Sequence, residues 1–229
     1  MIRARSLSIL LAVVAVATAA VASAQSPDEA LRADYEFQGT LTSSVGSVPA
    51  LRNLGDGNAY QEESVGGVQR TVLAFPEGNG LALAAASSII PTSEYTIDIL
   101  LRFETVSGYR RIVDFSNATG DIGLYDYNGS LNFYPSVTGT DRGFIENRWV
   151  QVTLTRDAAG NVVGYLNGLR QISFQDTEDR AVISQADVLR FFRDDNAIGG
   201  EQSAGAVARI RLYDRPLSAV EVAGLTLLP

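Results

Sequence analysis

The chain has 229 residues and a net charge of −8 at neutral pH, contains neither Cys nor His, and carries Arg as its only basic residue. The lack of Cys excludes disulfides and a thiolate nucleophile, and the lack of His and Lys excludes a Ser–His–Asp triad, imidazole zinc sites and Schiff-base chemistry. An acidic chain repels nucleic acids and anionic lipids, so neither is expected as a partner.

The first 24 residues have the pattern of a secretory signal peptide. Arg3 and Arg5 precede an uncharged apolar stretch, residues 7–21, which ends in Ala-Ser-Ala, a small-residue cleavage pattern. The alternative is a membrane anchor, but the stretch is shorter than the roughly 20 residues that span a bilayer. We therefore expect a secreted or periplasmic mature chain, residues 25–229, that forms one domain and has no membrane span.

Most of the mature sequence alternates between apolar and polar residues, as strands with one buried face do. Tyr95–Phe103 and Val150–Thr155 show the pattern most clearly. Further strands are predicted at short, even spacing over Arg110–Phe115, Ile122–Tyr127, Leu131–Tyr134, Val162–Leu166, Leu169–Phe174, Val188–Phe192 and Val207–Tyr213. Residues 42–68 are expected to form loops around weak strands. This spacing favours an all-β sandwich over βαβ units.

Two hairpins and one helix are indicated by local residue chemistry. Asn128-Gly129 and Asn167-Gly168 each separate two predicted strands and suit type I′ turns, in which both central residues need positive φ. Near the end of the chain, Ser218 and Glu221 form the pattern of a capping box, which predicts a short C-terminal helix from Ala219 to about Leu225.

Five stretches of the chain resemble, in order, the conserved stretches of laminin-G-like domains of the concanavalin A-like lectin/glucanase superfamily. They are Ala33–Gly39, Phe75–Leu83, Tyr95–Phe103, Asn147–Thr155 with Gly164–Gly168, and Gly205–Ser218. The resemblance implies an antiparallel two-sheet jelly-roll sandwich that binds glycans or extracellular proteins, often with calcium. Family members often carry Asp where this chain has Gln38 and Ala208, so a calcium site of the family cannot be transferred to those positions.

The densest group of oxygen donors follows the predicted strand Val188–Phe192. Asp194, Asp195, Asn196 and Glu201 lie on one loop at a rim of the sandwich and are the kind of ligand that Ca²⁺ collects in sets of six to eight. The alternative is a solvated loop whose Asp and Asn residues shape turns. A second acidic loop, Asp114–Asp126, is interpreted as turn residues.

Tyrosines in the middle of the chain are candidates for sugar contacts, because aromatic faces stack on the apolar faces of pyranose rings. Tyr125 and Tyr127 share one face of their predicted strand and are the predicted ligand-binding pair. Tyr109, Tyr134 and Trp149 are close in sequence, and Trp149 is expected to pack in the core.

The sequence lacks the Glu-x-Asp-x-Glu strand with which sandwich glycosidases place two carboxylates on one face. Glu104, Glu146 and Glu178 each have no acidic partner two residues away. We therefore expect a secreted, non-catalytic module that binds a carbohydrate. The alternatives are an adhesive component that binds an extracellular protein and, less favoured, a glycoside hydrolase.

Overall fold

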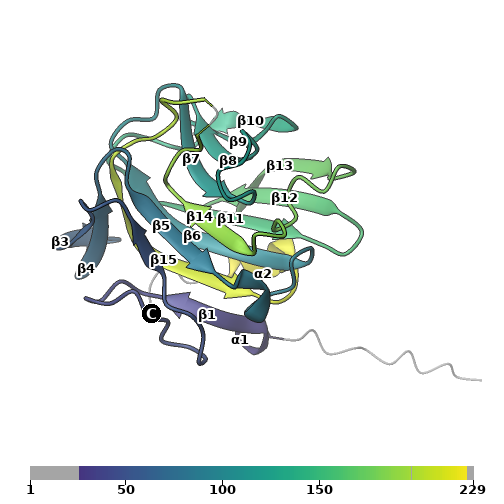
Figure 1. The fold of residues 1–229 in the computed structure, drawn as a ribbon, viewed down its shortest axis with the longest axis horizontal. Helices are drawn as coiled ribbons and strands as arrows, with labels where there is room; N and C mark the ends of the chain where they lie inside the picture. The colour runs from purple at the N-terminus through teal and green to yellow at the C-terminus, as the bar shows by residue number, and fades with distance from the viewer. Residues whose placement is uncertain (1–25, 197, 226–229) are drawn as a thin grey trace, which may run out of the picture.

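A computed structural model describes residues 26–196 and 198–225 of the chain. Its strands form two antiparallel sheets that lie face to face, which confirms the predicted all-β sandwich (Figure 1). The predicted signal peptide lies outside the described residues. No helix among the described residues is long and apolar enough to cross a membrane.

The larger sheet has eight strands. In spatial order seven of them are β13 (Leu169–Gln175), β12 (Asn161–Leu166), β11 (Val150–Arg156), β6 (Tyr95–Phe103), β15 (Gly205–Tyr213), β4 (Val68–Phe75) and β3 (Ala59–Val65). The eighth strand, β1 (Leu31–Tyr35), pairs with β15. The β3–β4 hairpin extends this sheet at the far left of Figure 1.

The smaller sheet has seven strands. In spatial order they are β10 (Val137–Arg142), β9 (Ser130–Tyr134), β8 (Gly123–Tyr127), β7 (Tyr109–Asp114), β14 (Val188–Phe191), β5 (Gly80–Ala84) and β2 (Arg52–Leu54). The edge strand β10, which the alternation did not predict, pairs with β9 and lies against β13 of the larger sheet.

The two hairpins form as predicted. In both turns the Asn and the Gly have positive φ, and each turn joins neighbouring antiparallel strands, β8 with β9 and β12 with β13. The predicted capping box begins α2 (Ala219–Ala223), where the Ser218 hydroxyl and the Glu221 carboxylate each accept a backbone N–H. The helix ends at Ala223, two residues before the predicted end, because Gly224 caps it.

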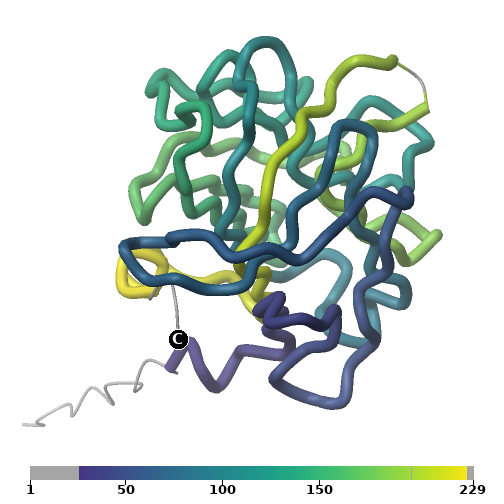
Figure 2. Tube along the Cα trace, turned by 90° about the vertical axis from the view of Figure 1, so that its left-hand side faces the viewer, coloured from purple at the N-terminus to yellow at the C-terminus, as the bar shows by residue number. Residues whose placement is uncertain are grey.

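Two short helical turns complete the fold. The first, α1 (Pro27–Ala30), precedes β1, and the 3₁₀ turn η1 (Ala86–Ser88) follows β5. Ala30 packs in one apolar cluster with Tyr213 and Val222, so the first and last described segments lie side by side (Figure 2, purple and yellow).

One continuous apolar cluster fills the space between the sheets. Along β6, Ile97, Ile99 and Leu101 point into it, as the alternation predicts. The opposite face of β6 was predicted to be solvated, but it is buried as well. Asp98 on that face is 2 % exposed and accepts hydrogen bonds from Gln151, Thr153 and Arg211. Polar neighbours on adjacent strands therefore bury one another on the outer face of the larger sheet.

Candidate functional site

The outer face of the smaller sheet carries the densest polar cluster among the described residues, and Arg111 is at its centre. On β8, Leu124 belongs to the core, so the alternate residues Tyr125 and Tyr127 point outward. Arg111 is the cross-strand partner of Tyr125, and its guanidinium carbon lies 4.5 Å from the centre of the Tyr125 ring. The Arg111 side chain is 0 % exposed.

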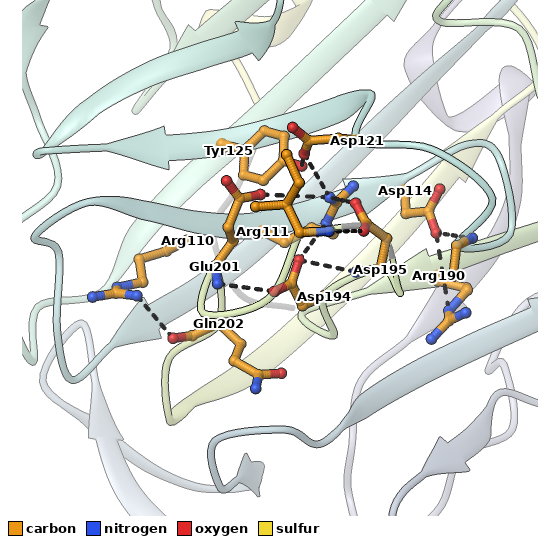
Figure 3. A network of polar contacts seen from close by, with 12 residues as sticks. Arg110, Arg111, Asp114, Asp121, Tyr125, Arg190, Asp194, Asp195, Glu201 and Gln202 are labelled. Carbon is orange, nitrogen blue, oxygen red and sulfur yellow. Dashed lines mark hydrogen bonds and ion pairs between the residues drawn. The ribbon is translucent and has the colours of Figure 1, made fainter.

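Four carboxylates from two loops surround this guanidinium (Figure 3). Its nitrogens lie 3.3 Å from Asp121, 3.6 Å from Asp194 and 3.7 Å from Glu201, and one nitrogen donates a hydrogen bond to Asp195. Asp121 comes from the loop before β8, and the other three come from the loop of residues 193–204, between β14 and β15. A buried charge needs such partners, because desolvation alone would cost several kcal/mol.

Gly123 provides the room in which Arg111 lies. A Cβ at this position would stand 3.0 Å from an Arg111 guanidinium nitrogen and 2.5 Å from the Val113 carbonyl oxygen. The loop is joined to the strand through its backbone as well, because the Arg111 N–H donates to the Glu201 carbonyl oxygen at 2.8 Å. The Glu201 side chain is thereby held beside the guanidinium.

Glu201 and Asp121 are neighbouring carboxyl groups, although 80 positions separate them in the sequence. Burial, together with the negative charge of Asp121 and a hydrogen bond to it, raises the pKa of Glu201 to about 7. The Tyr125 hydroxyl donates to Asp121 at 2.8 Å, and burial raises the pKa of Tyr125. The pair is thus able to hold a proton near neutral pH.

A group of tyrosines lies next to these carboxyl groups on the same face of the sheet. The Tyr109 ring stacks on Tyr127 with ring centres 4.2 Å apart, and it meets Tyr125 and Tyr134 edge to face at 5.4 Å and 5.7 Å. Tyr109, Tyr127 and Tyr134, which we call the tyrosine platform, are half-buried, whereas Tyr125 is fully buried. Burial, the neighbouring Tyr127 and Tyr134 and then the negative charges of Glu201 and Asp121 raise the pKa of Tyr109.

The predicted site residues thus meet on one face, but in unequal roles. Tyr127 belongs to the tyrosine platform, whereas Tyr125 lies beneath Arg111 with its hydroxyl bonded to Asp121. Asp194, Asp195 and Glu201 face Arg111, whereas Asn196 is exposed. Trp149, which was expected in the core, is only half-buried and packs instead against a small apolar cluster of the other sheet that includes Leu100.

The acidic residues of the second loop, Asp114–Asp126, have two different roles. Asp114 accepts the backbone N–H groups of Ser116 and Ala118, and Asp126 accepts that of Gly129 in the hairpin turn, as turn residues do. Asp121 instead joins the cluster. Sequence reasoning missed Arg111 and Asp121. The strand also carries Arg110 and Asp114, so the sequence alone did not distinguish Arg111 from its charged neighbours.

The fold and the family are shown by comparison with known proteins. The family model of the concanavalin A-like lectin/glucanases superfamily matches residues 76–223. Domain 4 of AbnA, a GH43 extracellular arabinanase from Geobacillus stearothermophilus, solved in complex with arabinotriose, is 18 % identical over 85 % of this chain and 97 % of that domain, with a TM-score of 0.63. No curated protein matches the sequence.

Toxin binding domains share the fold. The binding domain of Paraclostridial Mosquitocidal Protein 1 gives a TM-score of 0.66 at 15 % identity, and that of botulinum neurotoxin serotype D gives 0.60 at 12 %. Each match covers 86 % of this chain but only 51 % of the toxin domain.

We predict that Arg111→Met destabilises the protein by about 3–5 kcal/mol, because it leaves buried carboxylates without their counter-charge. The matched control is Arg32→Met, which breaks an exposed pair with Asp214 and should cost less than about 1 kcal/mol. Urea unfolding of both variants measures the difference. Equal losses would show that the cluster contributes no more than a surface ion pair.

We further predict that the stability falls as the pH rises from about 5 to about 8. The pKa of Glu201 and that of buried Asp126 are both raised to about 7, so in this range the folded state holds protons that the unfolded chain releases. Glu201→Gln should weaken this dependence and melt above the wild type at the higher pH. The exposed Glu178→Gln is the control. A wild type that becomes more stable as the pH rises would contradict the prediction.

The family match and the two-sheet fold agree, and the chain is a member of the concanavalin A-like lectin/glucanases superfamily.

Proposed function

We propose that the protein is a secreted, non-catalytic module that binds a carbohydrate chain on the outer face of the smaller sheet. The observation that carries the proposal is the tyrosine platform, whose half-buried rings pack around Tyr109, which in turn meets Tyr125, the residue whose hydroxyl donates to the Asp121 carboxylate. Aromatic faces provide apolar contact area with little loss of conformational entropy, and the polar groups orient the ligand.

The surroundings of the platform favour a sugar without negative charge. Tyr109 meets Tyr125 edge to face, the Tyr125 hydroxyl donates to the Asp121 carboxylate, and Arg111 is fully buried rather than presented to a ligand. Carboxylate acceptors suit sugar hydroxyls or an amine, and they repel uronates.

Two further observations support the proposal. The predicted signal peptide favours export, and the structurally similar arabinanase domain was solved with a bound oligosaccharide. The similar toxin structures include one in complex with synaptotagmin II, so a protein ligand is the outcome that the experiment must be able to detect.

We predict that Tyr109→Ala and Tyr127→Ala each weaken binding to a neutral polysaccharide about tenfold or more, because a central aromatic contact contributes about 1.4 kcal/mol or more. The matched control is Tyr60→Ala, which removes an exposed tyrosine from β3 of the other sheet and should leave affinity unchanged. Affinity electrophoresis in arabinan, β-glucan and polygalacturonate measures binding, and circular dichroism checks the fold.

Binding that survives both platform variants would contradict the proposed site. Capture of a protease-sensitive envelope component, with no affinity for any glycan, would contradict the ligand class. Turnover of a chromogenic glycoside that Glu201→Gln abolishes would show instead that the Asp121–Glu201 pair is catalytic.

A further inference from the structure

Two of the predicted calcium ligands, Asp194 and Asp195, already use both carboxylate oxygens in contacts within the protein. Calcium collects six to eight oxygens at about 2.3–2.6 Å. Both carboxylate oxygens of Asp194 already accept backbone N–H groups, from Asp195 and from Glu201, at 2.9 Å each. Asp195 accepts the N–H of Ile198 with one oxygen and binds Arg111 with the other.

The remaining predicted ligands do not complete a shell. Asn196 is exposed, and a Glu201 oxygen lies 3.7 Å from the Arg111 guanidinium. Over residues 26–196 and 198–225, no group of three or more acidic side chains is arranged to hold a metal ion. Calcium binding by this loop stays a prediction, and the residues as they lie do not fit it.

A positive charge is nevertheless present at the centre of this acidic loop, and it belongs to Arg111. The guanidinium donates to Asp121, to Asp195 and to the Ile122 carbonyl oxygen, and thereby joins the two loops that flank the tyrosine platform. Its fixed fork of donors suits carboxylates from several directions.

We infer that Arg111 is the resident cation of this loop and takes the place of a calcium ion, so that the binding face assembles without metal. The same geometry implies a latent cation site. If the guanidinium is removed, the carboxylates of Asp121, Asp195 and Glu201 are left facing the space it occupied, and a divalent ion is the natural replacement. The consequence for glycan binding rests on the proposed function, whereas the consequence for stability does not.

The test compares melting curves of the wild type, Arg111→Met and the double variant Arg111→Met/Asp195→Asn, each in calcium chloride and in EDTA. The wild type should melt at the same temperature in both solutions. Arg111→Met should melt lower in EDTA and rise by about 5–10 °C when calcium is about a hundredfold over its dissociation constant. The double variant should recover part of the loss in EDTA and respond less to calcium.

Calorimetric titration of the wild type with calcium chloride keeps the inference testable even if Arg111→Met does not fold. No heat of binding is expected. Calcium binding by the wild type that Asp195→Asn abolishes would overturn the inference. A folded Arg111→Met variant whose melting temperature is the same in calcium chloride and in EDTA would also overturn it. Affinity electrophoresis in arabinan with EDTA is the separate functional readout. Wild-type protein that binds no glycan with or without calcium refutes the proposed function and leaves the melting result standing.

Discussion

The outer face of the smaller sheet depends on the neutralisation of one buried guanidinium. Arg111 is fully buried on the outer face of a sheet, where its charge is tolerated only because carboxylates from two separate loops converge on it. This requirement holds Asp195 and Glu201 against β7 and keeps Asp121, from the segment before β8, close to them. Gly123 is part of the same arrangement, since a Cβ there would clash with the Val113 carbonyl oxygen at 2.5 Å and crowd the guanidinium at 3.0 Å.

The same ion cluster determines how the tyrosine rings pack. By packing on Tyr125, Arg111 holds that ring within the protein, and the Tyr125 hydroxyl in turn orients Asp121. Tyr109 then meets Tyr125 edge to face and stacks on Tyr127. A rigid ring surface bounded by carboxyl groups follows from this packing, and rigidity lowers the entropic cost of binding a flexible sugar chain.

The features that could be predicted well from the sequence depend on local residue chemistry. The Asn-Gly turns, the Ser218–Glu221 capping box and the strand alternation each depend on a few neighbouring residues, and the structure confirms them. The proximity of Asp121 to Glu201 depends instead on which strands become neighbours and in what register. The burial of Tyr125 likewise depends on a loop from a distant part of the chain. Alternation could therefore place the Tyr125 ring on the outer face, but it could not show that the loop and Arg111 cover the ring.

The polar outer face of the larger sheet shows the same limit. Alternation along β6 predicted a solvated face, because Asp98 and its neighbours are polar. Their burial follows from pairing across β11 and β15, whose registers place Thr153 and Arg211 opposite Asp98. Polarity in a strand therefore indicates the face that points away from the core, but not whether water reaches it.

The central claim is that carbohydrate binds on the tyrosine platform, and amide chemical-shift mapping tests it most directly. The ¹⁵N-labelled protein would be titrated with arabinotriose and with oligosaccharides of β-glucan. We expect saturable shifts confined to β7, β8, β9 and the loop of residues 193–204, around Tyr109, Tyr127 and Glu201. Shifts that cluster instead around α2 and β12, or no saturable shifts with any neutral oligosaccharide, would contradict the account.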